Sequence, residues 1–165
     1  MNPRPSALLM MLFLATAACA PQPESEPERL IGAWRSSLQF ENGAFAAIKD
    51  LEFMYVFNAG GTLTESSNYD GAPPVPPAYG VWRKTGPDEY EVKYEYYSTA
   101  PAAEAAFMKG AGWLPSGRGV FTETIKLAAD GKSFTSTMRY EAFDTKGKPA
   151  DGGGIARGQA VRIGF

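Results

Sequence analysis

Histidine is absent from all 165 residues, and this absence limits the chemistry that the chain can perform. It removes the usual general base at neutral pH, the commonest protein ligand of metal ions and every nucleophile that relies on an imidazole. The glycine-rich stretch at 146–154 lacks the Gly-Lys-Ser/Thr order of a phosphate-binding loop, so we interpret it as a flexible final hairpin loop. We therefore expect neither a metal nor a cofactor.

A strong excess of charge of either sign is also missing. Lysine and arginine together number 16, aspartate and glutamate number 18, and no basic block occurs along the chain. A nucleic-acid partner therefore has no electrostatic support. Apolar residues make up 44% of the sequence, which is ordinary for a globular protein with a single core.

Long hydrophobic runs are scarce, and the one candidate lies at the N-terminus. Residues 7–14 are apolar but too few to span a bilayer as a permanent helix. Arg4 precedes them and the small residues 15–18 follow, which is the three-part pattern of a secretory signal peptide. We predict a signal peptide over residues 1–18.

Cysteine occurs once, at Cys19, directly after those small residues. The stretch Thr16-Ala17-Ala18-Cys19 resembles the lipobox of bacterial lipoproteins, in which the cysteine sulfur takes a diacylglyceryl group and becomes the first residue. The resemblance implies lipidation at Cys19 and, because Ala20 follows, an outer-membrane anchor that faces the periplasm. The alternative is cleavage after Ala17, which leaves Cys19 as an unpaired thiol. Residues 19–29 continue as a Pro- and Glu-rich segment that we expect to be an extended tether.

From residue 30 onward the sequence consists of short stretches of β-branched and aromatic residues, separated by glycine and proline. The clearest strand is 89–98, where aromatic and aliphatic residues alternate with charged ones. Residues 100–110 favour a helix, which would plug or cover one end of a barrel. The eight expected strands are 34–40, 48–58, 62–69, 79–84, 89–98, 119–128, 133–144 and 155–165.

These elements predict an all-β fold over residues 30–165. Short sequential strands joined by hairpin turns are typical of an eight-stranded antiparallel up-and-down barrel, here with one short helix between strands five and six. Closure would leave no exposed strand edges. A two-sheet sandwich stays open as an alternative, because the number of strands does not separate the two architectures.

Two positions resemble a known superfamily. Gly32-Ala33-Trp34 is similar to the Gly-x-Trp that opens lipocalins and related calycin barrels, and Arg162 lies on the last expected strand. In that superfamily a late arginine commonly packs near the opening tryptophan or reaches into the cavity. The resemblance implies a calycin-like barrel over residues 30–165.

The interior of an eight-stranded barrel holds packed side chains or one small ligand. Strand alternation predicts that Tyr94, Glu123 and Tyr140 point inward, and Glu65 likewise. An unpaired buried charge is costly, so Arg162 would pair with an inward glutamate or meet an anionic ligand. The alternatives are tyrosines that belong to the core, an Arg162 that caps Trp34, and a Glu123 that faces water.

We therefore predict a lipid-anchored protein of the bacterial cell envelope that binds a small apolar or amphipathic molecule inside its barrel. The expected ligand contacts are Tyr94, Glu123, Tyr140 and Arg162, and no catalytic residue is assigned. One alternative is a filled barrel that contacts an envelope protein through the proline-rich loop 71–78. Another is an enzyme of the barrel isomerase or cyclase type that uses tyrosine and glutamate in place of histidine.

Overall fold

The computed structural model describes residues 29–69, 77–110 and 112–165. The predicted signal peptide, Cys19 and nearly all of the tether lie outside these ranges, as does most of the proline-rich loop. Within these ranges no helix is long and apolar enough to cross a membrane. The elements are β1 (Gly32–Phe40), β2 (Leu51–Phe57), β3 (Thr62–Ser67), β4 (Ala78–Gly86), β5 (Glu89–Pro101), α1 (Glu104–Phe107), β6 (Trp113–Leu127), β7 (Ser133–Phe143) and β8 (Pro149–Arg162).

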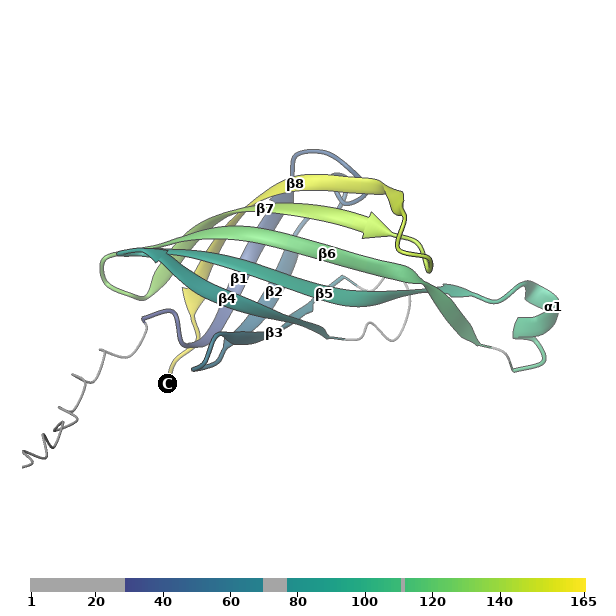
Figure 1. The fold of residues 1–165 in the computed structure, drawn as a ribbon, viewed down its shortest axis with the longest axis horizontal. Coiled ribbons are helices and arrows are strands. Elements are labelled where there is room, and N and C mark those ends of the chain that lie inside the picture. The colour runs from purple at the N-terminus through teal and green to yellow at the C-terminus, as the bar shows by residue number, and fades with distance from the viewer. Residues whose placement is uncertain (1–28, 70–76, 111) are drawn as a thin grey trace, which may run out of the picture.

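The eight strands form one closed antiparallel barrel (Figure 1). Each strand pairs with the next along the chain, and β8 pairs with β1 to close the sheet on itself. In the described barrel every strand therefore has a neighbour on both sides, which satisfies backbone groups that a sandwich would expose at its margins. The predicted up-and-down barrel is thus confirmed, and the sandwich alternative is excluded.

Period-two alternation positions the core inside this barrel. In β2 every second residue from Leu51 to Phe57 is buried, and the residues between them are partly or fully exposed. The same alternation in β5, β6 and β7 turns one apolar face inward. Burial of these faces is the main contribution to folding, at roughly 25 cal/mol for each Å² of apolar surface removed from water.

Aromatic rings in contact cross the interior from one end of the barrel to the other. Neighbouring ring centroids lie between 4.8 and 6.4 Å apart, the range in which tilted and offset rings attract each other. The series runs through Phe45, Tyr140, Phe121, Tyr94, Tyr55, Phe134 and Trp34.

Arg162 closes the barrel at the end where Trp34 lies, which we call the Trp34 end. Its guanidinium lies 4.2 Å from the Trp34 ring and donates to the carbonyl oxygens of Ile31 at 2.7 Å, Gly131 at 2.9 Å and Arg29. The Trp34 indole in turn donates to the Leu30 carbonyl at 2.8 Å. Of the two positions that the resemblance allowed for a late arginine, packing on the first tryptophan is the one observed.

The β1–β2 loop covers the opposite end, which we call the Phe45 end. The ring of Phe45 packs on Phe40 at 5.2 Å and on Tyr140 at 4.9 Å. The prediction that the helix would plug or cover an end is wrong. Residues 98–101 extend β5 and pair with 113–117 of β6, so only four residues remain helical, at the tip of a hairpin that projects from the barrel (Figure 1).

The glycine-rich stretch 146–154 is not the flexible loop that the sequence suggested, because β8 already begins at Pro149. Glycine here permits close approach of two backbones. A Cβ built on Gly43 would lie 1.9 Å from the carbonyl oxygen of Gly153, and one on Gly154 would lie 2.4 Å from that of Asn42. Small residues therefore let β8 pass beside the β1–β2 loop, where a larger side chain would separate them.

Replacing Arg162 with methionine tests the closure at the Trp34 end. The R162M variant loses three hydrogen bonds to carbonyl groups and the contact with the Trp34 ring, so we expect the free energy of unfolding to fall by about 2 to 4 kcal/mol. Urea unfolding followed by tryptophan fluorescence measures this change. R139M is the matched control: Arg139 is exposed on the outer face of β7, and we expect a change within about 0.5 kcal/mol. Equal changes in the two variants would contradict the role assigned to Arg162.

Candidate functional site

The candidate site is built around Glu123, which points into the barrel from β6 and is 1% exposed. Its Oε2 accepts a hydrogen bond from the Tyr55 hydroxyl at 3.2 Å, and the Tyr55 and Tyr94 hydroxyl oxygens lie 3.2 Å apart. The Tyr94 hydroxyl also lies 3.8 Å from the sulfur of Met138, to which it donates. Three strands, β2, β5 and β6, thus bring polar groups together in the middle of an aromatic interior.

A second carboxyl, that of Glu65, points inward from β3 and is 5% exposed. It lies opposite Tyr55 across the β2–β3 pairing. Oε1 of Glu65 and Oε1 of Glu123 make no hydrogen bond, and neither does the buried hydroxyl of Ser36 on β1. The hydroxyl of Ser136 on β7 lies close enough to Glu123 to influence it, but no hydrogen bond forms between them. Buried polar atoms without partners are uncommon in proteins and mark this cluster as a place where a ligand's donors would be accommodated.

Burial changes the acidity of both carboxyl groups. Loss of water contact, together with the negative charge of Glu123, raises the pKa of Glu65 to about 8. Loss of water contact also raises the pKa of Glu123 to about 7, although the hydroxyls of Ser136, Tyr55 and Tyr94 oppose this rise by favouring the carboxylate. The described residues include no buried lysine or arginine to offset these acids.

The structure separates the four predicted site residues. Tyr94 and Glu123 belong to one cluster, in which each lies beside Tyr55. Tyr140 is also inward and 7% exposed, but its hydroxyl lies 3.1 Å from that of Tyr96, nearer the Phe45 end. Arg162 lies at the Trp34 end and donates to backbone carbonyls, so the predicted pairing of Arg162 with an inward glutamate is wrong.

Tyr55 belongs to this cluster but was not among the ligand contacts predicted from the sequence. Its period-two position between Phe53 and Phe57 indicates an inward ring, but the sequence does not show which hydroxyl an inward acid will meet. That depends on the offset between β2 and β6, which do not pair with each other. Burial and the neighbouring Glu123 raise the pKa of Tyr55 well above its usual value, so it keeps its proton.

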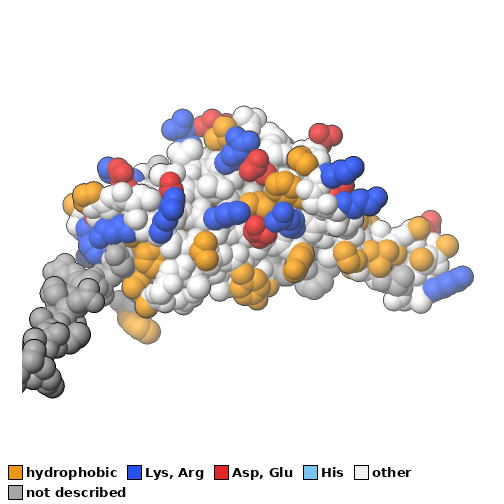
Figure 2. Space-filling model, viewed as in Figure 1, with side chains coloured by type: hydrophobic (Ala, Val, Ile, Leu, Met, Phe, Trp, Pro, Cys, Tyr) orange, Lys and Arg blue, Asp and Glu red, His pale blue; other side chains and the backbone are white. Residues whose placement is uncertain are grey.

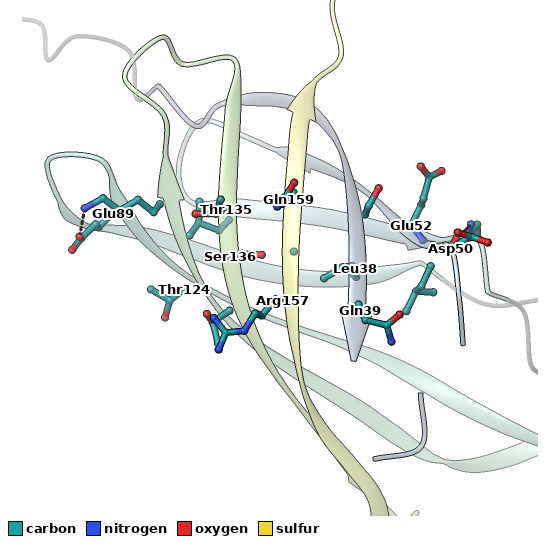
Figure 3. Close-up of a pocket in the computed structure, with 17 residues that line it drawn as sticks. Leu38, Gln39, Asp50, Glu52, Glu89, Thr124, Thr135, Ser136, Arg157 and Gln159 are labelled. Atoms are coloured by element: carbon teal, nitrogen blue, oxygen red, sulfur yellow. Dashed lines mark hydrogen bonds and ion pairs between the residues drawn. The ribbon is translucent and has the colours of Figure 1, made fainter. Parts of the chain in front are cut away.

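A groove of about 970 Å³ lies on the outer wall of the barrel (Figure 3). Thr124, Arg157 and Gln39 lie along one side, and Thr135, Gln159 and Glu52 lie along the other. These are outward residues of two neighbouring cross-strand rows, and the row between them, which includes Ser136 and Leu38, turns its side chains inward. The groove therefore lies on the outer face of the sheet, whereas Glu65 and Glu123 point to its inner face.

Charges of both signs are mixed over the outer surface. On the face shown in Figure 2, lysines and arginines lie among aspartates and glutamates, and no broad patch of one sign forms. Several are paired, such as Arg118 with Glu95 at 2.6 Å and Lys126 with Glu89 at 2.8 Å. In the part of the chain that the structure covers, no three potential metal ligands come together.

Neither a protein-family model nor a curated protein sequence matches this chain.

The two buried carboxyls predict an unusual dependence of stability on pH. Both pKa values are higher in the folded protein than the ordinary value of 4.5, so the native state holds protons that the unfolded chain releases. The contribution of these two groups to the free energy of unfolding should therefore be constant below about pH 4.5 and become unfavourable as the pH rises toward 8, by at most about 1.4 kcal/mol per pH unit for each group.

Urea unfolding across this range, in the native protein and in a variant with Glu65→Gln and Glu123→Gln, measures the effect. The variant should lose most of the decline, because glutamine does not titrate. Glu141→Gln, at an outward position of β7, is the control and should keep the decline. A double variant with the same pH dependence as the native protein would show that these carboxyls are not the cause.

Proposed function

We propose that this protein binds a small, mostly apolar molecule inside its barrel, and that a lipid on Cys19 anchors it in the bacterial cell envelope. The observation that carries the binding proposal is Glu123, which is almost fully buried among aromatic rings yet has one carboxyl oxygen without a partner. Ligand sites in proteins commonly combine an apolar, aromatic lining with a few polar groups that fix orientation.

The route of entry in this proposal is the Phe45 end. At the Trp34 end, the hydrogen bonds of Arg162 tie β8 to the chain before β1 and to the β6–β7 loop. At the opposite end, the half-buried ring of Phe45 rests on Tyr140 and forms an edge contact with Tyr69 at 5.8 Å. A ligand that moves this ring aside reaches Tyr140, then Phe121, and then the carboxyl cluster.

Extraction and mass spectrometry test the binding proposal. The mature protein, purified without denaturant, is extracted with organic solvent, and an intact sample is weighed by native mass spectrometry. We expect a stoichiometric small molecule that is reduced in Glu123→Gln and retained in Glu141→Gln, whose carboxyl lies outside the barrel. A clean blank, repeated with protein taken from native membranes, would instead favour the filled barrel that the series of ring contacts also supports.

An acid–base enzyme is a second candidate, favoured by the Tyr55–Glu123 hydrogen bond at 3.2 Å. A carboxyl with a pKa of about 7 can both take up and release a proton at neutral pH, which suits isomerisation chemistry. The molecule recovered by extraction would decide between the candidates. If it is converted on prolonged incubation with the native protein but not with Glu123→Gln, the protein is an enzyme; if it is recovered unchanged from both, it is a ligand.

Lipidation at Cys19 has its own test. Cells that express the full chain are grown with radiolabelled palmitate, and the protein is isolated from the membrane fraction. We expect label in the native chain and none in Cys19→Ser, because that substitution removes the only sulfhydryl in the sequence. Equal labelling of the two chains, or none in either, would contradict the lipoprotein hypothesis.

A further inference from the structure

We propose that the polar end of the ligand is a cationic amine, held between the carboxyl groups of Glu65 and Glu123. The inference rests on the proposed binding function and names its ligand class. It begins from two acids that are 95% or more buried, each with one oxygen lacking a partner, on β3 and β6 of the same barrel. The charge of Glu123 acts on Glu65, which places the two carboxyl groups near each other. Because these carboxyl oxygens lack a donor within the protein, we expect a ligand that supplies hydrogen-bond donors.

The groups that face the two acids are all neutral or acidic. Tyr55 from β2, Tyr94 and Tyr96 from β5 and Ser136 from β7 supply hydroxyl groups only, and Ser36 from β1, which lies near Ser136, adds another hydroxyl. No basic side chain of the described residues is buried with them. The guanidinium of Arg162 is committed to three carbonyls at the Trp34 end.

These neutral and acidic surroundings favour some polar groups of a ligand over others, depending on the charge of the group. A carboxylate or phosphate would meet two acids and no cation, so its burial would lack compensation. A hydroxyl would satisfy one or two acceptors without charge. An ammonium group offers three donors and a positive charge, and hydrogen bonds between ionised partners are the strongest of these options. An amine is therefore the best match to the site.

The aromatic surroundings support the same class. Tyr55 and Tyr94 meet edge to face at 5.9 Å and 81°, and Tyr94 stacks on Phe121 at 4.9 Å. Rings gathered around a buried position attract cations through their electron-rich faces. They also give the apolar body of an amphipathic amine a surface to pack against.

Binding of an amine would be linked to proton release. Burial raises the pKa of both acids, so each is partly protonated near neutral pH. When an ammonium enters, a proton leaves a carboxyl for the solvent, and the resulting carboxylate pairs with the cation. Amine affinity should thus rise between pH 6 and pH 8, while the affinity for a neutral molecule of the same size should not.

Titration calorimetry with three probes of equal chain length tests the inference on the native, mature protein. At about pH 7.5 we expect hexylamine to bind about tenfold more tightly than hexanol, and hexanoate to bind most weakly. Repeating the hexylamine titration in buffers of different ionisation enthalpy should reveal proton release. Glu65→Gln and Glu123→Gln should each weaken hexylamine about tenfold or more and leave hexanol unchanged, whereas Glu141→Gln should change neither.

The outcomes separate the two proposals. If hexanol and hexanoate bind as well as hexylamine, or if the glutamine variants bind hexylamine normally, the amine inference is overturned and apolar binding stands. If none of the three probes binds and extraction yields no molecule, both the inference and the proposed function are overturned. Near-ultraviolet circular dichroism checks that the variants are folded, which we expect because glutamine keeps the shape of glutamate and carries no charge to bury.

Discussion

Pairing of the first strand with the last is the constraint on which the rest of the structure depends. Seven hairpin-type pairings form between neighbours in the sequence, but only β1 with β8 turns the sheet into a barrel and encloses its interior. Arg162 strengthens that seam, because one side chain joins the end of β8 to the chain before β1, to the β6–β7 loop and to the Trp34 ring. Burial of the carboxyls and the raised pKa values both follow from this closure.

The interior combines features with opposite effects on stability. The aromatic rings favour folding, whereas Glu65 and Glu123 oppose it, since two acids lose water contact with no base nearby. A leucine or methionine at either position would avoid that cost. Binding and catalytic sites commonly keep polar groups that lower the stability of the protein, because the function depends on them.

Much of the fold follows from the sequence, because alternation in strands such as β5 is clear and the turns are marked by Gly, Pro and Asp. The inward direction of Glu123 was predictable for the same reason. Other features depend on the distance between segments far apart in the chain. Ala100 and Pro101 have a helix-like context, yet they pair with Leu114 and Trp113 in an extension of the sheet. The partner of Glu123 depends on strands that do not pair with each other, so single-strand patterns do not specify it.

The contacts of Arg162 with the carbonyls of Arg29 and Ile31 also hold the beginning and the end of the domain side by side. Each strand pairs with its successor and the last pairs with the first, so the strands form a closed ring. The chain itself connects every neighbouring pair in this ring except β8 and β1. A short linker between these two strands would allow the chain to be reopened at another hairpin, such as the one that projects with α1 at its tip (Figure 1). In such a circular permutant the order of synthesis changes while the barrel, its seam and its buried acids keep their places.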